Sequence, residues 1–529
     1  MLSSVYSTGG IVTAPHHLAS DIGRDVLRDG GNAIEAMIAM AAIIPVVYPH
    51  MNAIGGDGFW IIKPSGKNPI GIDACGAAAA SATPQLYRAK GLTNIPTRGP
   101  LAANTVAGTL SGWSAAQDIG SKMGGKQSRE RLLEPAIFYA ERGFPMTENQ
   151  ARTTREKLNE LKSIPGFERA FLLNGIPPKE GELFQQRRLG ATLRRLAADG
   201  FDSFYRGPLA RDIAADLARA GTLLSIEDLE AHNARILTPL NVQLSTGTVW
   251  NMPPPTQGVA SLITLGLFDR IPVQEPDTFT HIHVLVECIK QAFLIRDIHV
   301  QDPAVMTVNP EVFLQADYLD TLAEKIDHGH ALPWSTIGQD GDTVWMGALD
   351  KDGNAVSFIQ SIYWEFGSGL VLEDTGILWQ NRGCSFSLKD GSLNQLAPNR
   401  RPFHTLNPAL AELVDDRVLS FGAMGGEGQP QTQSLIYSRH VQFGQGLQQA
   451  ITAPRFLLGR TWGDTGTNLK IESRFGEGIF SELRSAGHDL ETIQPFSNLM
   501  GHAGAVVLNK NGLMEGASDP RSDGKAAGI

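Results

Sequence analysis

The chain has 529 residues, 42% of them hydrophobic, which is enough apolar sequence for a large buried core. Its 45 basic and 55 acidic residues give a formal net charge of −10, and the basic residues form no stripe. This distribution excludes a nucleic-acid surface and a polybasic membrane patch. The three cysteines, Cys75, Cys288 and Cys384, have no C-x-x-C spacing, so we expect neither a disulfide framework nor a zinc site.

The start of the chain carries no targeting signal that we can identify. Residues 1–17 lack both the basic segment and the apolar segment of a signal peptide. The most apolar stretch, Ala33 to Val47, is too short to cross a bilayer and contains Glu35 and Pro45, so it predicts a buried helix. With so few cysteines, these features predict a cytoplasmic protein without a membrane partner.

The first 62 residues predict two helices and a buried strand. A helix from His17 to Gly30 precedes the helix at Ala33, which Asn32 can cap. Residues 54–62, IGGDGFWII, contain glycines followed by an apolar run, and this run predicts a buried strand. A dinucleotide-binding glycine motif requires a helix after its glycines, so we exclude that interpretation.

Helical periodicity dominates residues 128–235 and returns further along the chain. The predicted helices include 187–199, 208–219, one starting at the Ser225 capping sequence, 280–297 and 316–326. Residues 242–251 predict one strand, followed by a rigid loop at Pro253 to Pro255. His281 and His283 are two residues apart and lie on different helix faces, so we interpret them as core or surface histidines rather than metal ligands.

Residues 343–430 predict strands, short turns and many glycines. A hairpin begins at Thr343, after a polar glycine-rich loop, and turns at residues 350–354. The chain is helix-rich first and sheet-rich later, with strands in both parts. This order predicts an α/β (α+β) fold in which helices cover two layers of antiparallel sheet.

Thr343 stands at the start of this hairpin, directly after Asp342. A threonine hydroxyl is a weak nucleophile at neutral pH and needs a neighbouring base. The residue's own α-amino group can serve, because its pKa is about 7.7–8.0, but only if the chain is cut before the threonine. The ordinary alternative is that threonine occurs here because β-branched residues favour strands.

A pair of glycines, Gly425 and Gly426, follows the apolar segment Arg417 to Phe421. Their unhindered backbone N–H groups could bind the oxyanion of an acyl-transfer reaction. Glycine pairs also mark ordinary turns between a strand and a helix. Both interpretations stay open at this point.

Polar residues with catalytic or binding potential gather after the hairpin begins. They are Ser361 on the second strand, then Asn381, Arg382, Ser385, His404 and Thr405. Arg382 is a natural ligand for a small carboxylate, because a guanidinium binds this group at two points. A surface salt bridge would account for an arginine equally well.

In their order along the chain, several segments resemble the γ-glutamyltransferase family of N-terminal-nucleophile hydrolases. The segments are GGNAIEAMIAM, VVYPHMNAIGGDGFW, NMPPPTQG, DTVWMGALDKDGNAVSF, FGSGLVLEDTGILWQN, NRRPFHTLNPAL, GAMGGEGQPQ, APRF and GASDPRSDG. The resemblance covers nearly the whole chain. The combination is highly specific, although no single segment is.

The resemblance implies a four-layer αββα sandwich and a proenzyme that cuts itself between Asp342 and Thr343. Residues 1–342 would form a large subunit and residues 343–529 a small one, together making one globular unit. Thr343 would be the nucleophile and, through its amine, the base. Ser361 would support the nucleophile, and Gly425 and Gly426 would form the oxyanion hole.

Several positions depart from the pattern of family members that act on glutathione. By the resemblance, an arginine that holds the glutamyl α-carboxylate is Cys75 here, and an acidic residue that holds the α-ammonium is Ser385. Tyr363 replaces an asparagine, and His404 and Thr405 replace two serines. Losing two charge-assisted contacts, each worth about 1.5–3 kcal/mol, predicts binding of a γ-glutamyl donor that is weaker by about two to four decades.

The pattern is most similar to the cytoplasmic branch of the family that cleaves the amide of oxamate, a very small oxo-acid, in purine-ring catabolism. Tyr363 and Trp364 would narrow the pocket, and Arg382 would hold the single carboxylate. The resemblance therefore implies a self-processing threonine amidohydrolase. Alternatives are a glutathione hydrolase or γ-glutamyltransferase with an altered clamp, a cephalosporin-type acylase, and a non-catalytic family member.

The expected reaction needs no metal and no organic cofactor, because the amine of Thr343 would supply the base. The expected partners are the small amide substrate and the two subunits of one precursor. A homodimer of processed heterodimers is a further expected assembly. No nucleic acid and no membrane is expected to bind.

Overall fold

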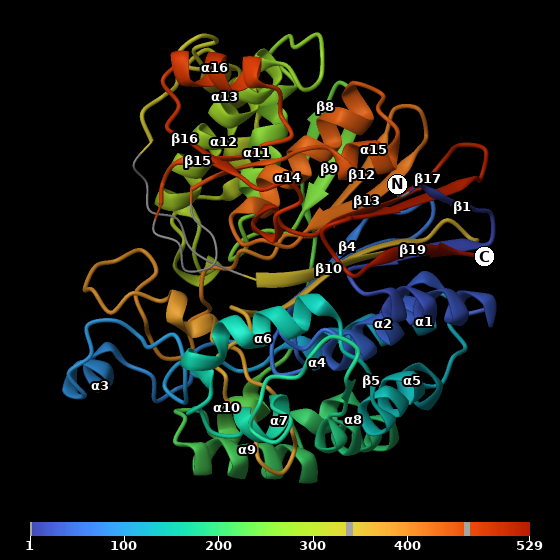
Figure 1. The fold of residues 1–529 in the computed structure, drawn as a ribbon, viewed down its shortest axis with the longest axis vertical. Helices are drawn as coiled ribbons and strands as arrows, with labels where there is room; N and C mark the ends of the chain where they lie inside the picture. The colour runs from blue at the N-terminus through green and yellow to red at the C-terminus, as the bar shows by residue number, and fades with distance from the viewer. Residues whose placement is uncertain (1–2, 335–341, 460–465) are drawn as a thin grey trace.

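Two seven-stranded sheets, each antiparallel throughout, form the centre of the molecule (Figure 1). The computed structural model describes residues 3–334, 342–459 and 466–529. In spatial order, the β10 sheet consists of β19 (Lys525–Gly528), β2 (Gly10–Ala14), β10 (Asp342–Asp350), β11 (Ala355–Tyr363), β3 (Asp57–Lys63), β4 (Ile70–Ala74) and β7 (Arg235–Leu237). The β13 sheet consists of β1 (Val5–Ser7), β18 (Met514–Ser518), β17 (Ala503–Leu508), β13 (Val418–Ala423), β12 (Ala409–Leu413), β9 (Gly247–Asn251) and β8 (Leu240–Leu244).

Helices cover the outer face of each sheet, which makes four layers (Figure 1). On the side of the β10 sheet lie α1 (His17–Arg28), α2 (Ala33–Val47), α3 (Pro84–Ala89), α4 (Thr109–Lys122), α5 (Arg129–Arg142), α6 (Glu148–Leu161), α7 (Phe167–Phe171), α8 (Arg187–Asp199), α9 (Pro208–Ala220) and α10 (Ile226–Ala231). On the side of the β13 sheet lie α11 (Gly258–Phe268), α12 (Phe279–His299), α13 (Ala316–Ala323), α14 (Gly428–Tyr437), α15 (Leu447–Thr452) and α16 (Glu477–Ser485). The predicted αββα sandwich of the N-terminal-nucleophile hydrolase type is confirmed.

The remaining strands of the described residues form two smaller sheets. One joins β14 (Phe456–Leu458), β15 (Leu469–Glu472) and β16 (Leu490–Ile493), and the other joins β5 (Phe144–Pro145) and β6 (Leu183–Phe184). No helix in the parts of the chain described here has the length and apolar character needed to cross a membrane.

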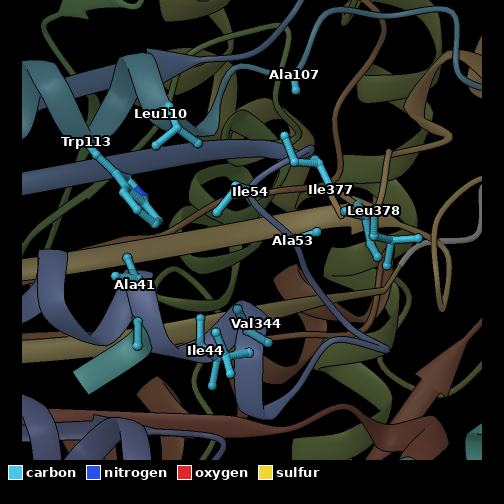
Figure 2. Packing of buried hydrophobic residues seen from close by; sticks show 14 of the residues in the cluster. Ala41, Ile44, Ala53, Ile54, Ala107, Leu110, Trp113, Val344, Ile377 and Leu378 are labelled. Atoms are coloured by element: carbon cyan, nitrogen blue, oxygen red, sulfur yellow. The ribbon is translucent and has the colours of Figure 1, made fainter. Parts of the chain in front are cut away.

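Among the described residues, three large apolar cores hold the layers together, and β10 contributes to two of them. Successive strand residues point to opposite faces. Val344 therefore packs in the core between the β10 sheet and its helices, where Figure 2 shows it beside Ile44 of α2. Trp345 packs in the core between the two sheets. The β10 strand is buried on both faces and is held firmly in place.

The hairpin of β10 and β11 contains a β-bulge at its open end. Asp342 pairs with Tyr363, whereas Val344 pairs with Gln360, so one residue of β10 faces two residues of β11. The loop predicted before Asp342 falls in residues 335–341, outside the described residues. The hairpin itself and its turn after Asp350 are confirmed.

Most helices begin and end close to where the sequence predicts them. Asn32 caps α2 in a full capping box with Glu35, and Ser225 caps α10 in the same way. Two predictions are wrong. Residues 242–251 form part of a two-stranded hairpin, β8 and β9, rather than one strand. The strand-rich prediction also fails for residues 364–408, where the chain is irregular except for isolated bridges and a 3-10 turn at Arg382–Ser385.

Candidate active site

Thr343 lies on β10 and points toward the space between the two sheets. It shares this face of the strand with Trp345, two residues further along. In the continuous chain Thr343 is only 1% exposed. Its hydroxyl oxygen lies 3.5 Å from the amide nitrogen of Gln429, which donates to it. Gln429 was not among the residues singled out from the sequence.

Ser361 is one of the two β11 residues that face Thr343 across the bulge. Its side chain shares a strand face with Ile359, which packs between the sheets. The Ser361 hydroxyl accepts a 2.8 Å hydrogen bond from the backbone N–H of Tyr363. Tyr363 has a φ of 82°, in the left-handed region that bulky residues rarely adopt. The bulge thus brings two hydroxyl-bearing residues, Thr343 and Ser361, onto facing strands.

Gly425 and Gly426 form the turn between β13 and α14. Their φ angles are 115° and 52°, which glycine adopts without steric cost. Among the described residues, neither N–H group donates a hydrogen bond, so both remain available at the N-terminal end of the helix. Gln429, the partner of Thr343, lies in the first turn of the same helix. The glycine pair and Thr343 therefore meet at one end of α14.

Gln257 connects this glycine turn to residues 404–406 of the chain. Its side-chain amide donates to the carbonyl oxygens of Gly426 and Thr405, each over 2.8 Å. Arg296 donates in turn to the Gln257 amide oxygen over 3.1 Å and pairs with Glu427 at 3.0 Å. All of these groups are buried. This network holds Thr405 and the glycine turn in a fixed relation.

Arg382 lies in the interior, so the surface salt-bridge interpretation is wrong. The side chain is 1% exposed, and its guanidinium stacks 3.7 Å above the Tyr363 ring. It donates to the Thr405 hydroxyl over 3.2 Å and to the Phe403 carbonyl over 3.5 Å, and its Nε has no partner among the described residues. Within residues 3–334, 342–459 and 466–529 it forms no ion pair, and desolvation lowers its pKa.

The predicted site residues are thus linked by a closed series of contacts. In order, the series runs from Thr343 to Gln429, the Gly425-Gly426 turn, Gln257, Thr405, Arg382, Tyr363, and through the strand ladder to Asp342. Residues from five separate stretches of sequence (257, 342–363, 382, 405 and 425–429) therefore surround one place. This place is the open end of the β10–β11 hairpin.

Asp57 is a buried residue of this region that the sequence analysis did not single out. Its Oδ2 lies 3.0 Å from Nε2 of His404, and its Oδ1 accepts from the N–H groups of Gly76 and Gly108 and from Gln380. Asp57 also pairs with Ser361 in the ladder between β3 and β11. The sequence did contain a signal for this residue, namely an aspartate at the start of an apolar strand. A carboxylate buried there must be surrounded by several hydrogen-bond partners.

Burial raises the pKa of Asp57 to about 7, although the N–H donors and Arg382 oppose this shift. Burial also lowers the pKa of His404 well below its usual range, and its Nδ1 has no partner among the described residues. Near neutral pH the pair is therefore an uncharged imidazole beside a carboxyl group that titrates. A neutral His404 can still accept or donate one hydrogen bond at Nδ1.

Asp57→Asn is expected to change how stability depends on pH. A carboxyl pKa raised in the folded state favours the protonated fold, so this stabilisation is complete below about pH 4 and is lost as pH rises through about 7. The wild type should lose up to about 4 kcal/mol of unfolding free energy, relative to Asp57→Asn, across that window. Urea unfolding of both proteins at several pH values measures this difference, and parallel curves would contradict it.

The remaining predicted residues occupy the periphery of the same region. The Cys75 thiol is buried 3.6 Å from the Gly76 carbonyl, and burial raises its pKa well above the usual range. The Asn381 amide donates to the Thr97 carbonyl over 2.8 Å and accepts from the Trp364 N–H over 3.1 Å, so it holds backbone in place. The Ser385 hydroxyl is buried and has no partner among the described residues.

Within the described parts of the chain, two buried groups of side chains have the ligand types for a metal ion. Asp57, Cys75 and His404 have ligand atoms within 4.8 Å of one another, as do His283, Glu287 and His488. In the second group His283 bonds His488 at 2.8 Å, and Lys290 pairs with Glu287 at 2.7 Å. These side chains satisfy one another, and His281 and His283 are confirmed as core residues. No disulfide joins Cys75, Cys288 or Cys384 within the described parts of the chain.

Comparisons with known proteins agree with this arrangement. Residues 19–529 match the family model described as Gamma-glutamyltranspeptidase. The chain is 52% identical, over the full length of both chains, to an oxamate amidohydrolase proenzyme of Klebsiella pneumoniae, and 39% identical, again over both full lengths, to a glutathione hydrolase-like YwrD proenzyme of Bacillus subtilis.

Its fold also matches the crystal structure of a cephalosporin acylase from Bacillus halodurans. That match has a TM-score of 0.92 and 32% identity, and it covers 100% of this chain and 97% of the other. Family model, full-length relatives and fold point to one group of enzymes. The chain belongs to the gamma-glutamyltranspeptidase family, whose members are hydrolases acting on amide C–N bonds.

Proposed function

We propose that this protein is a self-processing threonine amidohydrolase that converts oxamate to oxalate and ammonia. The observation that carries the proposal is Arg382, a buried guanidinium with no ion pair among the described residues. It stacks on Tyr363, which pairs in the strand ladder with Asp342, next to Thr343. A substrate with one carboxylate would supply the missing negative charge through charge-assisted hydrogen bonds.

Self-processing would begin with attack of the Thr343 hydroxyl on the carbonyl carbon of Asp342. The peptide C–N bond breaks as the C–O bond forms, which leaves an ester and a free α-amine on Thr343. Water then hydrolyses the ester and releases the Asp342 carboxylate. Residues 1–342 and 343–529 become separate subunits that stay together, because β10 lies between β2 and β11 and is buried on both faces.

In the mature protein the α-amine of Thr343 would take the proton of its own hydroxyl. The hydroxyl oxygen attacks the amide carbon of oxamate, and the developing oxyanion accepts hydrogen bonds from Gly425 and Gly426. The C–N bond breaks, and the ammonium of Thr343 returns the proton to the departing ammonia. Water hydrolyses the remaining ester to give oxalate and regenerate Thr343.

Because oxamate is much smaller than a γ-glutamyl group, the two positions that would hold a glutamyl head group need no charged side chain here. Cys75 and Ser385 stand at these positions, and burial keeps the Cys75 thiol protonated by raising its pKa. Tyr363, held over Arg382, fills space that a longer substrate would need. The 52% identical relative is named for oxamate, which supports the same choice of substrate. We further propose that the enzyme acts in the cytoplasm, in purine-ring catabolism.

Purified protein is expected to release ammonia from oxamate and to hydrolyse a γ-glutamyl anilide far more slowly. The expected preference in kcat/KM is at least about 10²-fold, because a γ-glutamyl donor would lack two charge-assisted contacts. Ammonia is followed with a coupled assay and the anilide by its absorbance. Rapid anilide hydrolysis without ammonia release from oxamate would establish the glutathione-hydrolase alternative instead.

A further inference from the structure

The peptide group between Met424 and Gly425 has two sides with different surroundings. Its N–H belongs to Gly425, one of the two proposed oxyanion donors. Its carbonyl oxygen lies against Gly501, where a methyl group in place of the glycine hydrogen would overlap that oxygen. Gly501 has a φ of 71°. The backbone N–H of Met424, on the other side of the Met424 Cα, donates to the His502 carbonyl over 2.9 Å. The orientation of this peptide therefore depends on the segment 500–502.

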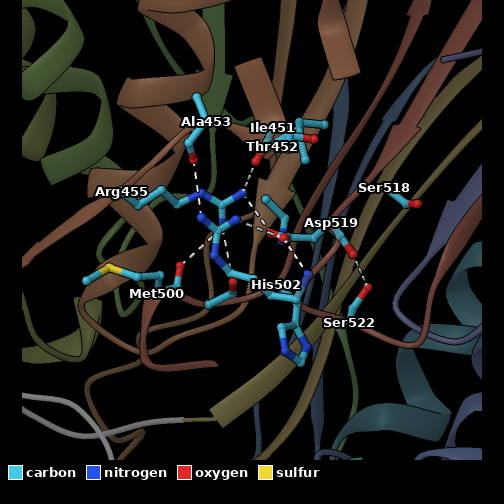
Figure 3. Close-up of polar contacts among 12 residues, drawn as sticks. Ile451, Thr452, Ala453, Arg455, Met500, His502, Ser518, Asp519 and Ser522 are labelled. Atoms are coloured by element: carbon cyan, nitrogen blue, oxygen red, sulfur yellow. Dashed lines mark hydrogen bonds and ion pairs between the residues drawn. The ribbon is translucent and has the colours of Figure 1, made fainter. Parts of the chain in front are cut away.

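A buried arginine holds segment 500–502 in place. Arg455 donates from Nη1 to the carbonyl oxygens of Met500 and Gly501 over 3.2 and 3.0 Å, and from Nη2 to that of Ile451 over 2.8 Å. Figure 3 shows the Arg455 guanidinium among these groups. The side chain is fully buried, so the contacts are shielded from water and fix the carbonyls strongly.

Arg455 is itself oriented by Asp519, at the opposite side of the guanidinium. The two side chains pair at 2.7 Å, and Asp519 also accepts from Arg521 at 3.0 Å and from the Ala503 N–H at 2.8 Å. Although burial opposes it, the two guanidinium groups hold the pKa of Asp519 at about 2. Asp519 therefore stays ionised. The Ala503 contact fastens it to the residue that follows segment 500–502.

We propose that Arg455, Asp519 and Gly501 are positioning residues for the oxyanion donor at Gly425. Asp519 orients Arg455, Arg455 holds the carbonyls of segment 500–502, and Gly501 sets the plane of the Met424–Gly425 peptide. None of the three needs to touch the substrate. The inference rests on the proposed function, in which the Gly425 N–H stabilises the tetrahedral intermediate.

A misoriented oxyanion donor affects the transition state far more than the bound substrate. The charge that it stabilises develops only during attack on the amide carbon. Loss of one donor typically lowers kcat by about 10²–10³-fold. Disturbance of this peptide should therefore lower kcat and leave KM nearly unchanged. A general loss of folding would instead lower the amount of active enzyme and the melting temperature together.

Gly501→Ala is the direct test, with Gly207→Ala as its matched control. Both glycines combine a positive φ with an extended ψ, at 71° and 167° for Gly501 and 100° and −157° for Gly207, so alanine brings similar backbone strain at each. A methyl group at Gly207 meets nothing within 4 Å, whereas one at Gly501 meets the Met424 carbonyl. We expect kcat for oxamate to fall about 10²-fold in Gly501→Ala, with KM within about threefold, and to stay unchanged in Gly207→Ala.

Arg455→Lys provides a second, graded variant. A lysine ammonium can still pair with Asp519 but cannot hold two carbonyls and a carboxylate in the fixed geometry of a guanidinium. We expect a fall in kcat of about tenfold at nearly constant KM. Cleavage into residues 1–342 and 343–529 is checked first on a denaturing gel, so that each kcat refers to processed enzyme.

The outcomes separate this inference from the proposed function. If the wild type hydrolyses the γ-glutamyl anilide rather than oxamate, the proposed substrate fails, but the same kcat comparison with the anilide still tests the positioning role. Unchanged kcat in Gly501→Ala with either substrate would overturn the inference. A crystal structure of Gly501→Ala gives a readout without turnover, because the Met424–Gly425 peptide should be rotated, and an unmoved peptide would also overturn it.

Discussion

Thr343→Ala is expected to give one uncut chain of 57.0 kDa with no measurable amidase activity. The variant lacks the hydroxyl that would attack Asp342, and its α-amine would stay in a peptide bond. In other hydrolases, removing the nucleophile lowers kcat by about 10⁶-fold. A denaturing gel reports the cut, and ammonia release from oxamate reports the activity. The wild type should show two fragments on the same gel.

Two further variants show whether this loss is specific. Thr343→Ser retains a hydroxyl and should still be cut and active, at a lower rate. Thr13→Ala removes another buried threonine, on the neighbouring strand β2 of the same sheet, and should be cut and fully active. If Thr343→Ala were cut at the same bond, the autocatalytic account would be wrong.

Arg382→Met is expected to lower kcat/KM for oxamate by about 10³-fold. The guanidinium would form two charge-assisted hydrogen bonds to the substrate carboxylate, each worth about 1.5–3 kcal/mol. The neutral diamide oxamide lacks this carboxylate, so its slower hydrolysis should change less than about threefold. The ratio of the two substrates therefore isolates the contact with the carboxylate. Steady-state ammonia release measures both reactions.

The melting temperature of Arg382→Met tests whether its lower activity reflects a loss of folding. Arg382 forms no ion pair among the described residues, and the buried Asp57, whose charge it favours, keeps its hydrogen-bond partners Gly76, Gly108, Gln380 and His404. Below about pH 7, where Asp57 is protonated, the melting temperature should therefore stay close to that of the wild type. Arg400→Met is the matched control, since Arg400 binds the carbonyls of Leu393 and Gln395 instead. Equal losses for oxamate and oxamide in Arg382→Met would show that Arg382 does not bind the carboxylate.

Local chemistry accounts for the parts of the fold that could be predicted. Three features determine the structure only of residues close to them in the chain. They are the capping residue Asn32, the continuous apolar run of α2 and the glycines before β3. Their signals therefore need no knowledge of distant contacts. The same holds for the hairpin of β10 and β11, whose turn is stabilised by Asp350, which accepts from the N–H groups of Asp352 and Asn354.

The two wrong predictions concern segments that distant residues shape. The turn between β8 and β9 at Ser245 is fixed by hydrogen bonds to Asp269, which follows α11. Residues 245–248, Ser-Thr-Gly-Thr, interrupt the apolar alternation, but the threonines on both sides of Gly247 favour strands and so hide the turn. The irregular region 364–408 is held by contacts such as Trp379 to the Thr105 carbonyl and Ala78 to the Arg400 carbonyl. Single-sequence periodicity contains no record of such partners.

The sequence by itself determined the elements and the candidate chemistry: a threonine at the start of a hairpin, a glycine pair after a strand, and an arginine between them in the chain. These are properties of short segments, where backbone preference and side-chain type act locally. Only the tertiary structure decided that Arg382 is buried without an ion pair, that Asp57 faces His404, and that Gln257 and Gln429 join the site. Burial and pairing depend on which distant segments meet across the two sheets, and that meeting gives each side chain its charge state and its partners.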